Sequence, residues 1–454
     1  GSDGNLYTWG NNGNGQLGRD TGTTPADRPG RVTPPTGITF TQTSAGSSHS
    51  VAVGSDGNLY TWGDNSYGQL GRDTGTTPAD RPGRVTPPTG ITFTQTSAGQ
   101  YYSMAVGSDG NLYTWGRNEN GQLGRDTGTT PADRPGRVTP PTGITFTQTS
   151  AGSSHSVAVG SDGNLYTWGN NGNGQLGRDT GTTPADRPGR VTPPTGITFT
   201  QTSAGSSHSV AVGSDGNLYT WGNNGNGQLG RDTGTTPADR PGRVTPPTGI
   251  TFTQASAGGW HSMAIGSNGN LYTWGYNGYG QLGRDGTLGT PGPVLTDADV
   301  TFTQTNAGYW HSMAVGSDGN LYTWGSGSNG KLGRDTSSTP ANRPGRVVFP
   351  SRGTPTRVLF DRLQSTVPTA GADDTWTVTT PAHTAGGVPV TISWTLDGTP
   401  QADDTGNTYR YVTIGSLPLT GSHGILLLAA IGLTLMTATD AARRHRHPTH
   451  TSHE

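Results

Sequence analysis

Histidine followed by serine recurs along this chain, and such a pair can supply the base and the nucleophile of an acyl-transfer reaction. The pair or its Tyr-Ser equivalent occurs at six places: His49-Ser50, Tyr102-Ser103, His155-Ser156, His208-Ser209, His261-Ser262 and His311-Ser312. A nucleophile needs one base and one orienting group at a single site, so six near-equivalent pairs indicate a structural role. We expect these side chains to satisfy hydrogen bonds within a repeated fold, and we predict no catalytic residue.

Other kinds of site chemistry find little support in the composition. The 454 residues include no cysteine, which excludes disulfides and thiolate metal sites. The formal net charge is −2 and no basic face stands out, which argues against nucleic acid as a partner. No phosphate-binding or dinucleotide motif occurs, so no cofactor is predicted. Four histidines near the C-terminus are interpreted as part of a solvated tail rather than a metal site: His445, His447, His450 and His453.

A repeat organises the first three quarters of the chain. The motif GS(D/N)GNLYTWG begins at seven places, spaced by 53 residues five times and then by 50: Gly1, Gly54, Gly107, Gly160, Gly213, Gly266 and Gly316. In the third unit, apolar and polar residues alternate over 91–96, 102–106 and 112–115, which predicts three strands. Asp-Gly between the last two indicates a hairpin turn, and a fourth short strand is expected near 137–138.

Three or four short strands in each unit of about 50 residues are typical of a propeller blade. A β-solenoid is the main alternative, but its coils are usually shorter. We therefore expect an all-β, seven-bladed β-propeller over residues 1–349. Only six A-G-x-x-(H/Y)-S motifs accompany the seven Trp-Gly motifs, so the first blade is expected to be incomplete and the chain to be a fragment.

Three linked motifs recur in order: A-G-x-x-H-S-x-A-V, D-G-x-L-Y-x-W-G and N-x-x-G-Q-L-G. This combination resembles the repeat of the regulator of chromosome condensation family over about residues 1–349. The resemblance implies a seven-bladed propeller. The chain departs from the family in the long Asp/Arg/Pro-rich connection that begins at Arg19, which we expect at the rim.

Strand patterns of another kind follow the propeller. Four further strand candidates begin at Val358, Asp374, Val388 and Thr408. The run TWTVTTPAHTAGGVPVTISW resembles immunoglobulin-like domains of the IPT/TIG group, which act as spacers or binding modules. A small immunoglobulin-like β-sandwich is therefore expected over residues 354–414.

The C-terminal segment, residues 417–454, resembles the LPxTG sorting signal of Gram-positive surface proteins. The matching residues are Leu417, Pro418, Leu419, Thr420 and Gly421. An apolar run from Ile425 to Ala438 and an arginine cluster follow, in the order of a membrane-spanning sorting helix and its cytoplasmic tail. The resemblance implies that a sortase attacks the Thr420 carbonyl, releases Gly421 onward and joins the protein to peptidoglycan. The expected location is the cell surface, with membrane contact only through this segment.

Two loops vary between otherwise nearly identical units. The Ala-Gly loop is the pair of residues after Ala-Gly, and the Trp-Gly loop is the group of up to four residues after Thr-Trp-Gly. Aromatic residues gather in or beside these loops and are candidate ligand-binding residues, because Tyr and Trp dominate binding hot spots. They are Tyr67, Tyr101 and Tyr102 in the second and third units, and Trp260, Tyr276, Tyr279, Tyr309 and Trp310 in the sixth and seventh. The alternative is ordinary variation at exposed turns.

The sequence thus predicts a non-enzymatic surface protein whose propeller binds an unknown protein or host-surface ligand. A first alternative is an enzyme inhibitor, because this propeller also resembles a secreted β-lactamase inhibitory protein with aromatics at the same two loops. A second is a nucleotide-exchange factor, the role of the family's namesake. Exchange activity needs a small GTPase in the same compartment, and a wall anchor would place this protein elsewhere. Fold alone does not decide among them.

Overall fold

Strands make up nearly all of the regular structure in the computed structural model, in which one 3-10 turn, η1 (Ser328–Gly330), is the only helical element of the described residues. The structure describes residues 1, 4–19, 22–72, 77–125, 129–178, 181–231, 234–285, 289–296, 300–337, 341–349, 354–370, 376–381, 386–396, 399–400 and 404–411. One compact unit comprises Asn5–Phe349, and the strands after Phe349 belong to a second unit.

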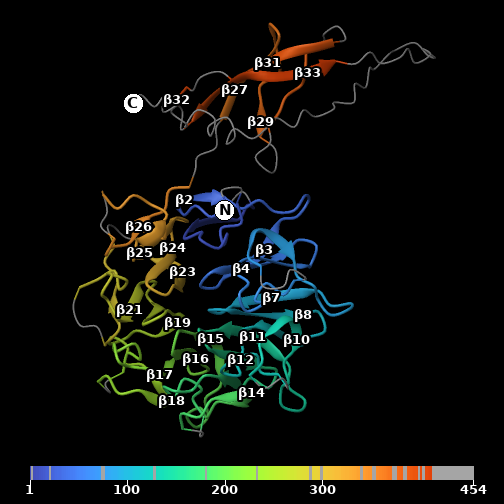
Figure 1. Ribbon diagram of the computed structural model, residues 1–454. Coiled ribbons are helices and arrows are strands. Elements are labelled where there is room, and N and C mark those ends of the chain that lie inside the picture. Colours follow the sequence, from blue (N-terminus) through green and yellow to red (C-terminus); the bar gives the residue numbers. More distant parts are fainter. Residues whose placement is uncertain are drawn as a thin grey trace, which may run out of the picture. The chain divides into compact units, whose positions relative to one another are not determined.

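Consecutive antiparallel sheets, here called blades 1 to 7 in chain order, follow one another around a ring in the first unit (Figure 1). Blade 1 has two strands, β1 (Tyr7–Gly10) and β2 (Ala26–Arg31). Blades 2 to 4 are β3 (Phe40–Ala45), β4 (His49–Gly54), β5 (Leu59–Gly63), β6 (Ala79–Arg84); β7 (Phe93–Ala98), β8 (Tyr102–Gly107), β9 (Leu112–Gly116), β10 (Ala132–Arg137); and β11 (Phe146–Ala151), β12 (His155–Gly160), β13 (Leu165–Gly169), β14 (Ala185–Arg190). Blades 5 to 7 are β15 (Phe199–Ala204), β16 (His208–Gly213), β17 (Leu218–Gly222), β18 (Ala238–Arg243); β19 (Phe252–Ala257), β20 (His261–Gly266), β21 (Leu271–Gly275), β22 (Gly292–Pro293); and β23 (Phe302–Ala307), β24 (His311–Gly316), β25 (Leu321–Gly325), β26 (Gly345–Arg346).

The third unit shows how far the sequence predicts a blade. The strands expected at 91–96, 102–106 and 112–115 are confirmed as β7, β8 and β9. The fourth strand, β10, begins earlier than expected, at Ala132, so part of the connection assigned to the rim is a strand. Its pairing with β9 shifts register between Ala132 and Gly136, where Pro135 has no N–H to donate. A proline is tolerated here because β10 is the last strand of its sheet.

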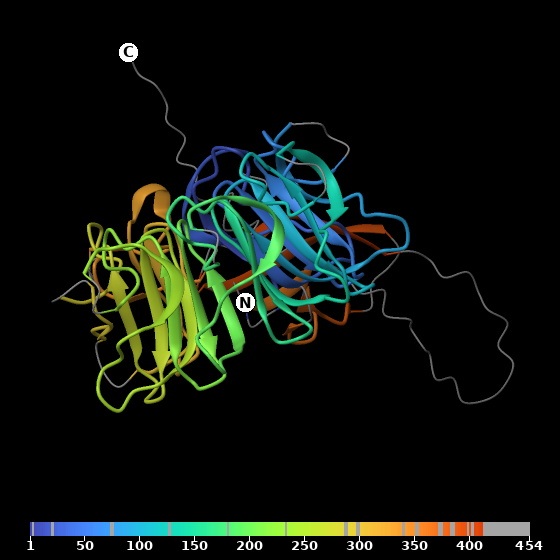
Figure 2. The ribbon, with the colours of Figure 1, turned by 90° about the horizontal axis from the view of Figure 1, so that it is seen from below.

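The blades pack face against face, with the sheets of neighbouring blades lying side by side in Figure 2. In blade 4 the indole of Trp168 is fully buried and its ring centroid lies 5.8 Å from that of Phe146. Its Nε1 donates to the Gln122 carbonyl of blade 3 at 2.8 Å. The equivalent bond joins every consecutive pair of blades from 1 to 7, so each Trp-Gly motif fixes a blade to the one before it.

Blade 1 closes the ring through the same kind of contact. Trp9 Nε1 donates to the Lys331 carbonyl of blade 7 at 2.9 Å. The phenylalanine that stacks on this tryptophan position in other blades is replaced by Phe349, which follows blade 7 and lies 5.4 Å from Tyr7 and 6.2 Å from Trp9 between ring centroids. The chain leaving the last blade thus completes the aromatic cluster of the first.

The second unit contains a five-stranded antiparallel sheet and a two-stranded one. The larger sheet comprises β27 (Thr354–Phe360), β28 (Leu363–Gln364), β31 (Gly386–Leu396), β32 (Thr399–Pro400) and β33 (Asp404–Tyr411), and the smaller pairs β29 (Thr369–Ala370) with β30 (Trp376–Thr377). Val358, Phe360, Val388 and Val390 form its small buried core. All four strand candidates of this region overlap observed strands, while the arrangement expected of an immunoglobulin-like sandwich stays a prediction.

The sorting segment is not part of the described chain. Leu417 to Gly421 and the apolar run from Ile425 to Ala438 all lie beyond Tyr411, the last residue described. Within the described ranges, no helix has the length and apolar character needed to span a membrane.

Candidate functional site

The repeated histidines form hydrogen bonds from blade to blade. His155 Nε2 lies 2.9 Å from Ser209 Oγ, and this hydroxyl donates to the Gln175 carbonyl at 3.0 Å. Because the serine proton is used for that carbonyl, the hydroxyl must accept from histidine, which places the imidazole proton on Nε2. The histidine is then a donor rather than a base, and the serine is not activated as a nucleophile. His49, His208 and His261 make the same contact, confirming the expected structural role of these residues.

Burial keeps these imidazoles neutral. It lowers the pKa of His49 and His208 to about 4 and that of His155 to about 3, where the neighbouring His208 adds to the effect. A general base in catalysis works best with a pKa near the ambient pH, which these groups lack. These imidazoles are therefore suited to hydrogen bonding between blades rather than to acid–base chemistry.

The two variable loops lie on one rigid backbone frame. Within blade 3, the Arg117 N–H at the start of the Trp-Gly loop donates to the Tyr101 carbonyl of the Ala-Gly loop at 2.9 Å. Between blades 3 and 4, the Gln100 N–H donates to the Gly152 carbonyl at 3.3 Å. The same bonds recur in other blades. Side chains in these loops therefore change without altering the frame that presents them.

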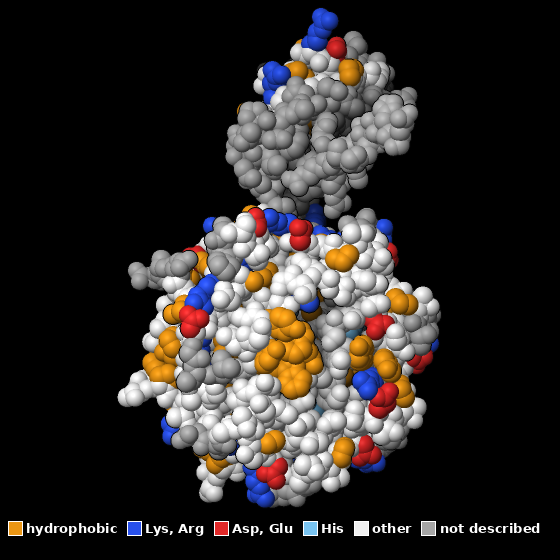
Figure 3. Space-filling view, turned by 60° about the vertical axis from the view of Figure 1, so that its left-hand side comes forward, with side chains coloured by type: hydrophobic (Ala, Val, Ile, Leu, Met, Phe, Trp, Pro, Cys, Tyr) orange, Lys and Arg blue, Asp and Glu red, His pale blue; other side chains and the backbone are white. Residues whose placement is uncertain are grey.

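Five of the predicted ligand-binding aromatics form one cluster, called here the Trp310 cluster: Trp260, Tyr276, Tyr279, Tyr309 and Trp310. Trp310 is at its centre, with ring centroids of Tyr309 and Tyr279 at 4.7 and 5.4 Å and a nearly parallel Trp260 at 6.2 Å. Tyr279 is 50% exposed and Tyr309 38%. Figure 3 shows a contiguous group of hydrophobic side chains on this side of the propeller.

The second predicted group is partly wrong. Tyr67 and Tyr101 do meet, with ring centroids 5.4 Å apart. Tyr102, however, is fully buried: it replaces the histidine of its blade, and its hydroxyl donates to the His155 carbonyl at 2.6 Å. It cannot contact a ligand on this face, because a side chain in the first position of β8 points between blades.

Sequence reasoning missed Arg117, which completes the second group. Its guanidinium carbon lies 5.5 Å from the ring centroid of Tyr67 and 5.9 Å from that of Tyr101, and it forms an ion pair with Glu119. We call these four residues the Arg117 cluster. The available signal was the position of Arg117 in a variable loop, since arginine is itself a hot-spot residue type.

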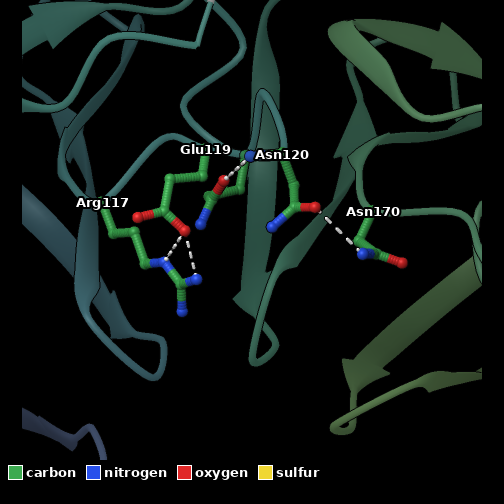
Figure 4. Close-up of polar contacts among 5 residues, drawn as sticks. Arg117, Glu119, Asn120 and Asn170 are labelled. Atoms are coloured by element: carbon green, nitrogen blue, oxygen red, sulfur yellow. Dashed lines mark hydrogen bonds and ion pairs between the residues drawn. The ribbon is translucent and has the colours of Figure 1, made fainter.

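Between the two clusters the same loop positions carry amides. Figure 4 shows Arg117 and Glu119 beside Asn120, whose Oδ1 accepts a hydrogen bond from Asn170 Nδ2 at 3.0 Å across the next blade junction. At the following junction Asn223 Nδ2 donates to Asn173 Oδ1 at 2.8 Å. In each case the fourth residue of one Trp-Gly loop meets the first residue of the next. No group of His, Asp or Glu side chains suited to a metal ion occurs in the part of the chain that the structure describes.

Comparison with known proteins agrees with this architecture. The RCC1-like domain matches residues 1–183 and 76–386. The ultraviolet-B receptor UVR8 of Arabidopsis thaliana is 33% identical over 288 residues, which are 61% of this chain and 62% of the receptor. The human E3 ubiquitin-protein ligase HERC2 is 32% identical over 265 residues, 58% of this chain and 5% of the ligase. The chain thus spans less than two thirds of either relative.

Solved structures show the same fold at lower identity. Yeast RCC1 (Prp20), solved in complex with Kap60, superposes with a TM-score of 0.64 and 23% identity over 76% of this chain and 83% of that protein. With family matches that together extend from residue 1 to residue 386, the chain belongs to the RCC1-like domain family.

Proposed function

We propose that this protein is a non-enzymatic, cell-surface protein-binding module whose ligand face is built from the Ala-Gly and Trp-Gly loops. The Trp310 cluster carries the proposal. Five Tyr and Trp side chains take loop positions that carry Ser or Asn in blades 4 and 5, on backbone hydrogen bonds that recur between these blades. They meet each other across the junction of blades 6 and 7. Large aromatic rings in a half-exposed cluster are typical of binding hot spots.

The relatives support a protein partner. The yeast RCC1 structure was solved bound to another protein, Kap60. RCC1-like propellers therefore offer protein-binding or regulatory modules, and we extend this role to the loop face here. The LPLTG sequence at 417–421 supports display on the wall, and the strands of the second unit would act as an immunoglobulin-like spacer.

The ligand face is tested by a double substitution, Trp260→Ala with Trp310→Ala. If both are anchors, each costs ~2 kcal/mol, so capture of a partner by the full chain should weaken by roughly a thousandfold. Affinity capture from secreted-protein and host-surface extracts, followed by titration of the captured protein, measures this. Captured proteins that bind the double variant as tightly as the parent would remove the face assignment, whereas a soluble secreted enzyme as the captured protein would favour an inhibitor.

Wall attachment is tested separately by Thr420→Ala. Sortase cleaves between the residues aligned with Thr420 and Gly421 in the sorting signal that this segment resembles, so the variant should move from the peptidoglycan fraction to the membrane or the medium. Fractionation of a Gram-positive host expressing the full chain behind a signal peptide measures this. Continued covalent linkage of the variant to peptidoglycan would show that another signal anchors the protein.

A further inference from the structure

We propose that the Tyr279–Trp310 pair of the Trp310 cluster receives an arginine side chain from the protein partner. This inference rests on the proposed function, because it names the chemistry that the partner brings to the same face. Its basis is a comparison between equivalent junctions of one molecule.

Contacts between neighbouring Trp-Gly loops show which residues are equivalent at different blade junctions. At three junctions the fourth residue of one Trp-Gly loop contacts the first residue of the next: Tyr67 with Arg117, Asn120 with Asn170, and Asn173 with Asn223. At the junction of blades 6 and 7 the corresponding residues are Tyr279 and Ser326, and the Ala-Gly loop supplies Trp310 where the Arg117 cluster has Tyr101.

The aromatic pairs at the two junctions have the same separation between rings and differ by 20° in their interplanar angle. The ring centroids of Tyr67 and Tyr101 are 5.4 Å apart with an interplanar angle of 43°, and those of Tyr279 and Trp310 are 5.4 Å apart at 63°. In the Arg117 cluster the chain itself places a guanidinium against both rings. That contact shows what kind of group this pair of loop positions accommodates.

At the Trp310 cluster none of the described residues supplies such a cation. Ser326 has a short neutral side chain, and its hydroxyl donates to Ser328 in its own loop at 3.4 Å. Among the described residues no lysine or arginine lies over the rings of Tyr279 or Trp310. Tyr279 is accordingly the most exposed aromatic of the face, at 50%.

Arginine fits this surface better than lysine. A guanidinium is planar and weakly hydrated, so it stacks on aromatic rings at a smaller desolvation cost than an ammonium. The Trp-Gly loops of blades 6 and 7, residues 276–279 and 326–329, contain no charged residue that would repel it or pair with it. The partner therefore contributes the cation, as Arg117 does within the chain.

The experiment supplies the arginine in cis. Ser326→Arg with Ser328→Glu copies Arg117 and Glu119 into the equivalent positions and leaves the net charge unchanged. The probe is a hexa-arginine peptide, titrated into the full chain at 150 mM salt by calorimetry and by tryptophan fluorescence. The matched control, Asn170→Arg with Gly172→Glu, makes the same exchange at a junction without aromatics. Far-UV circular dichroism and the melting temperature verify that both variants fold.

The expected result has two parts. The parent binds hexa-arginine several times more tightly than hexa-lysine, and Ser326→Arg/Ser328→Glu weakens hexa-arginine binding about tenfold while the control variant does not. Equal binding to parent and Ser326→Arg/Ser328→Glu, or equal binding of hexa-lysine, overturns the inference. So does a fluorescence response to the neutral sugar maltohexaose in place of hexa-arginine. If the peptide results contradict the inference while Trp260→Ala/Trp310→Ala still weakens partner capture, only the arginine assignment is wrong and the ligand face stands.

Discussion

Acidification from pH 6.5 to pH 4 is expected to unfold the propeller. Burial lowers the pKa of His49 and His208 to about 4 and of His155 and His261 to about 3, against 6.5 for the exposed side chain. Between these values the unfolded chain binds protons that the folded chain excludes, so the free energy of unfolding falls as the pH falls. Each histidine contributes about 1.4 kcal/mol per pH unit, so four together contribute about 5 kcal/mol per pH unit.

Between pH 6.5 and pH 4 the four histidines together remove roughly 10 kcal/mol, which is comparable with the whole stability of a folded domain, about 5–15 kcal/mol. The acid midpoint is therefore expected above pH 4, measured by circular dichroism and tryptophan fluorescence. The aspartates act later: burial alone would raise the pKa of Asp109, but hydrogen bonds from Asn111 and Tyr113 lower it below 3.8. Their protonation destabilises the fold only below that pH, so a midpoint above 4 separates the two effects.

Blade 3 supplies the control for this prediction. Tyr102 stands where other blades have histidine and bonds to the same elements of the next blade, so His155→Tyr should fold. The variant should lose one titrating group and show a shallower decline of stability between pH 6.5 and 4. Identical pH profiles for parent and variant would mean that the histidines do not drive acid unfolding.

Replacing Trp168 by alanine is expected to cost about 4 kcal/mol of stability. The indole is fully buried, stacks near Phe146 and donates to the Gln122 carbonyl of the neighbouring blade. The substitution leaves a cavity of indole size and removes one of the two hydrogen bonds to the Gln122 carbonyl, which still accepts from Ser156 Oγ. Trp→Ala changes in protein cores cost about 3–5 kcal/mol. Denaturant unfolding followed by far-UV circular dichroism measures the difference.

Trp9 provides the matched comparison, because it has the same place in blade 1. It keeps the bond to a carbonyl of the preceding blade, but its ring is only partly buried and packs against Phe349, itself 37% exposed. Trp9→Ala should therefore cost less than half as much. Equal losses at both positions would indicate that blade 1 is as well packed as blade 4.

The blade architecture could be predicted from the sequence because each repeat contains the alternating pattern of its inner strands and the turn between them. Alternation over residues 102–106 and the Asp-Gly turn that follows define β8, β9 and the hairpin between them. The start of β10 could not be placed, since Asp133, Arg134 and Pro135 show no strand pattern and lie in an irregularity of the pairing. Ala132 and Gly136 on either side of them pair with Gly116 and Thr114 of β9. Local pattern decides the inner strands, whereas tertiary pairing decides the outermost.

The candidate site was predictable in composition but not in its contacts. Variation between repeats identified Trp260, Tyr279 and Trp310, because the frame around them is constant. The same reasoning misplaced Tyr102, since a tyrosine that follows a variable pair looks exposed until the histidine positions of other blades are seen to be buried. Arg117 was missed because its partner Tyr67 belongs to another repeat, 50 residues earlier.

Both aromatic clusters lie across a blade junction. A segment that carries a whole cluster from one such protein to another must therefore span that junction. A cut at a blade boundary would separate Tyr279 from Trp310, or Tyr67 from Arg117, and so divide a binding surface. The stretch 259–310 keeps the Trp310 cluster whole and is flanked by Ala-Gly on one side and His-Ser on the other, which recur in most blades. Recombination within those shared flanks would transfer an entire recognition patch. The hydrogen bonds between blades would form again, because the residues that make them are the same in both proteins.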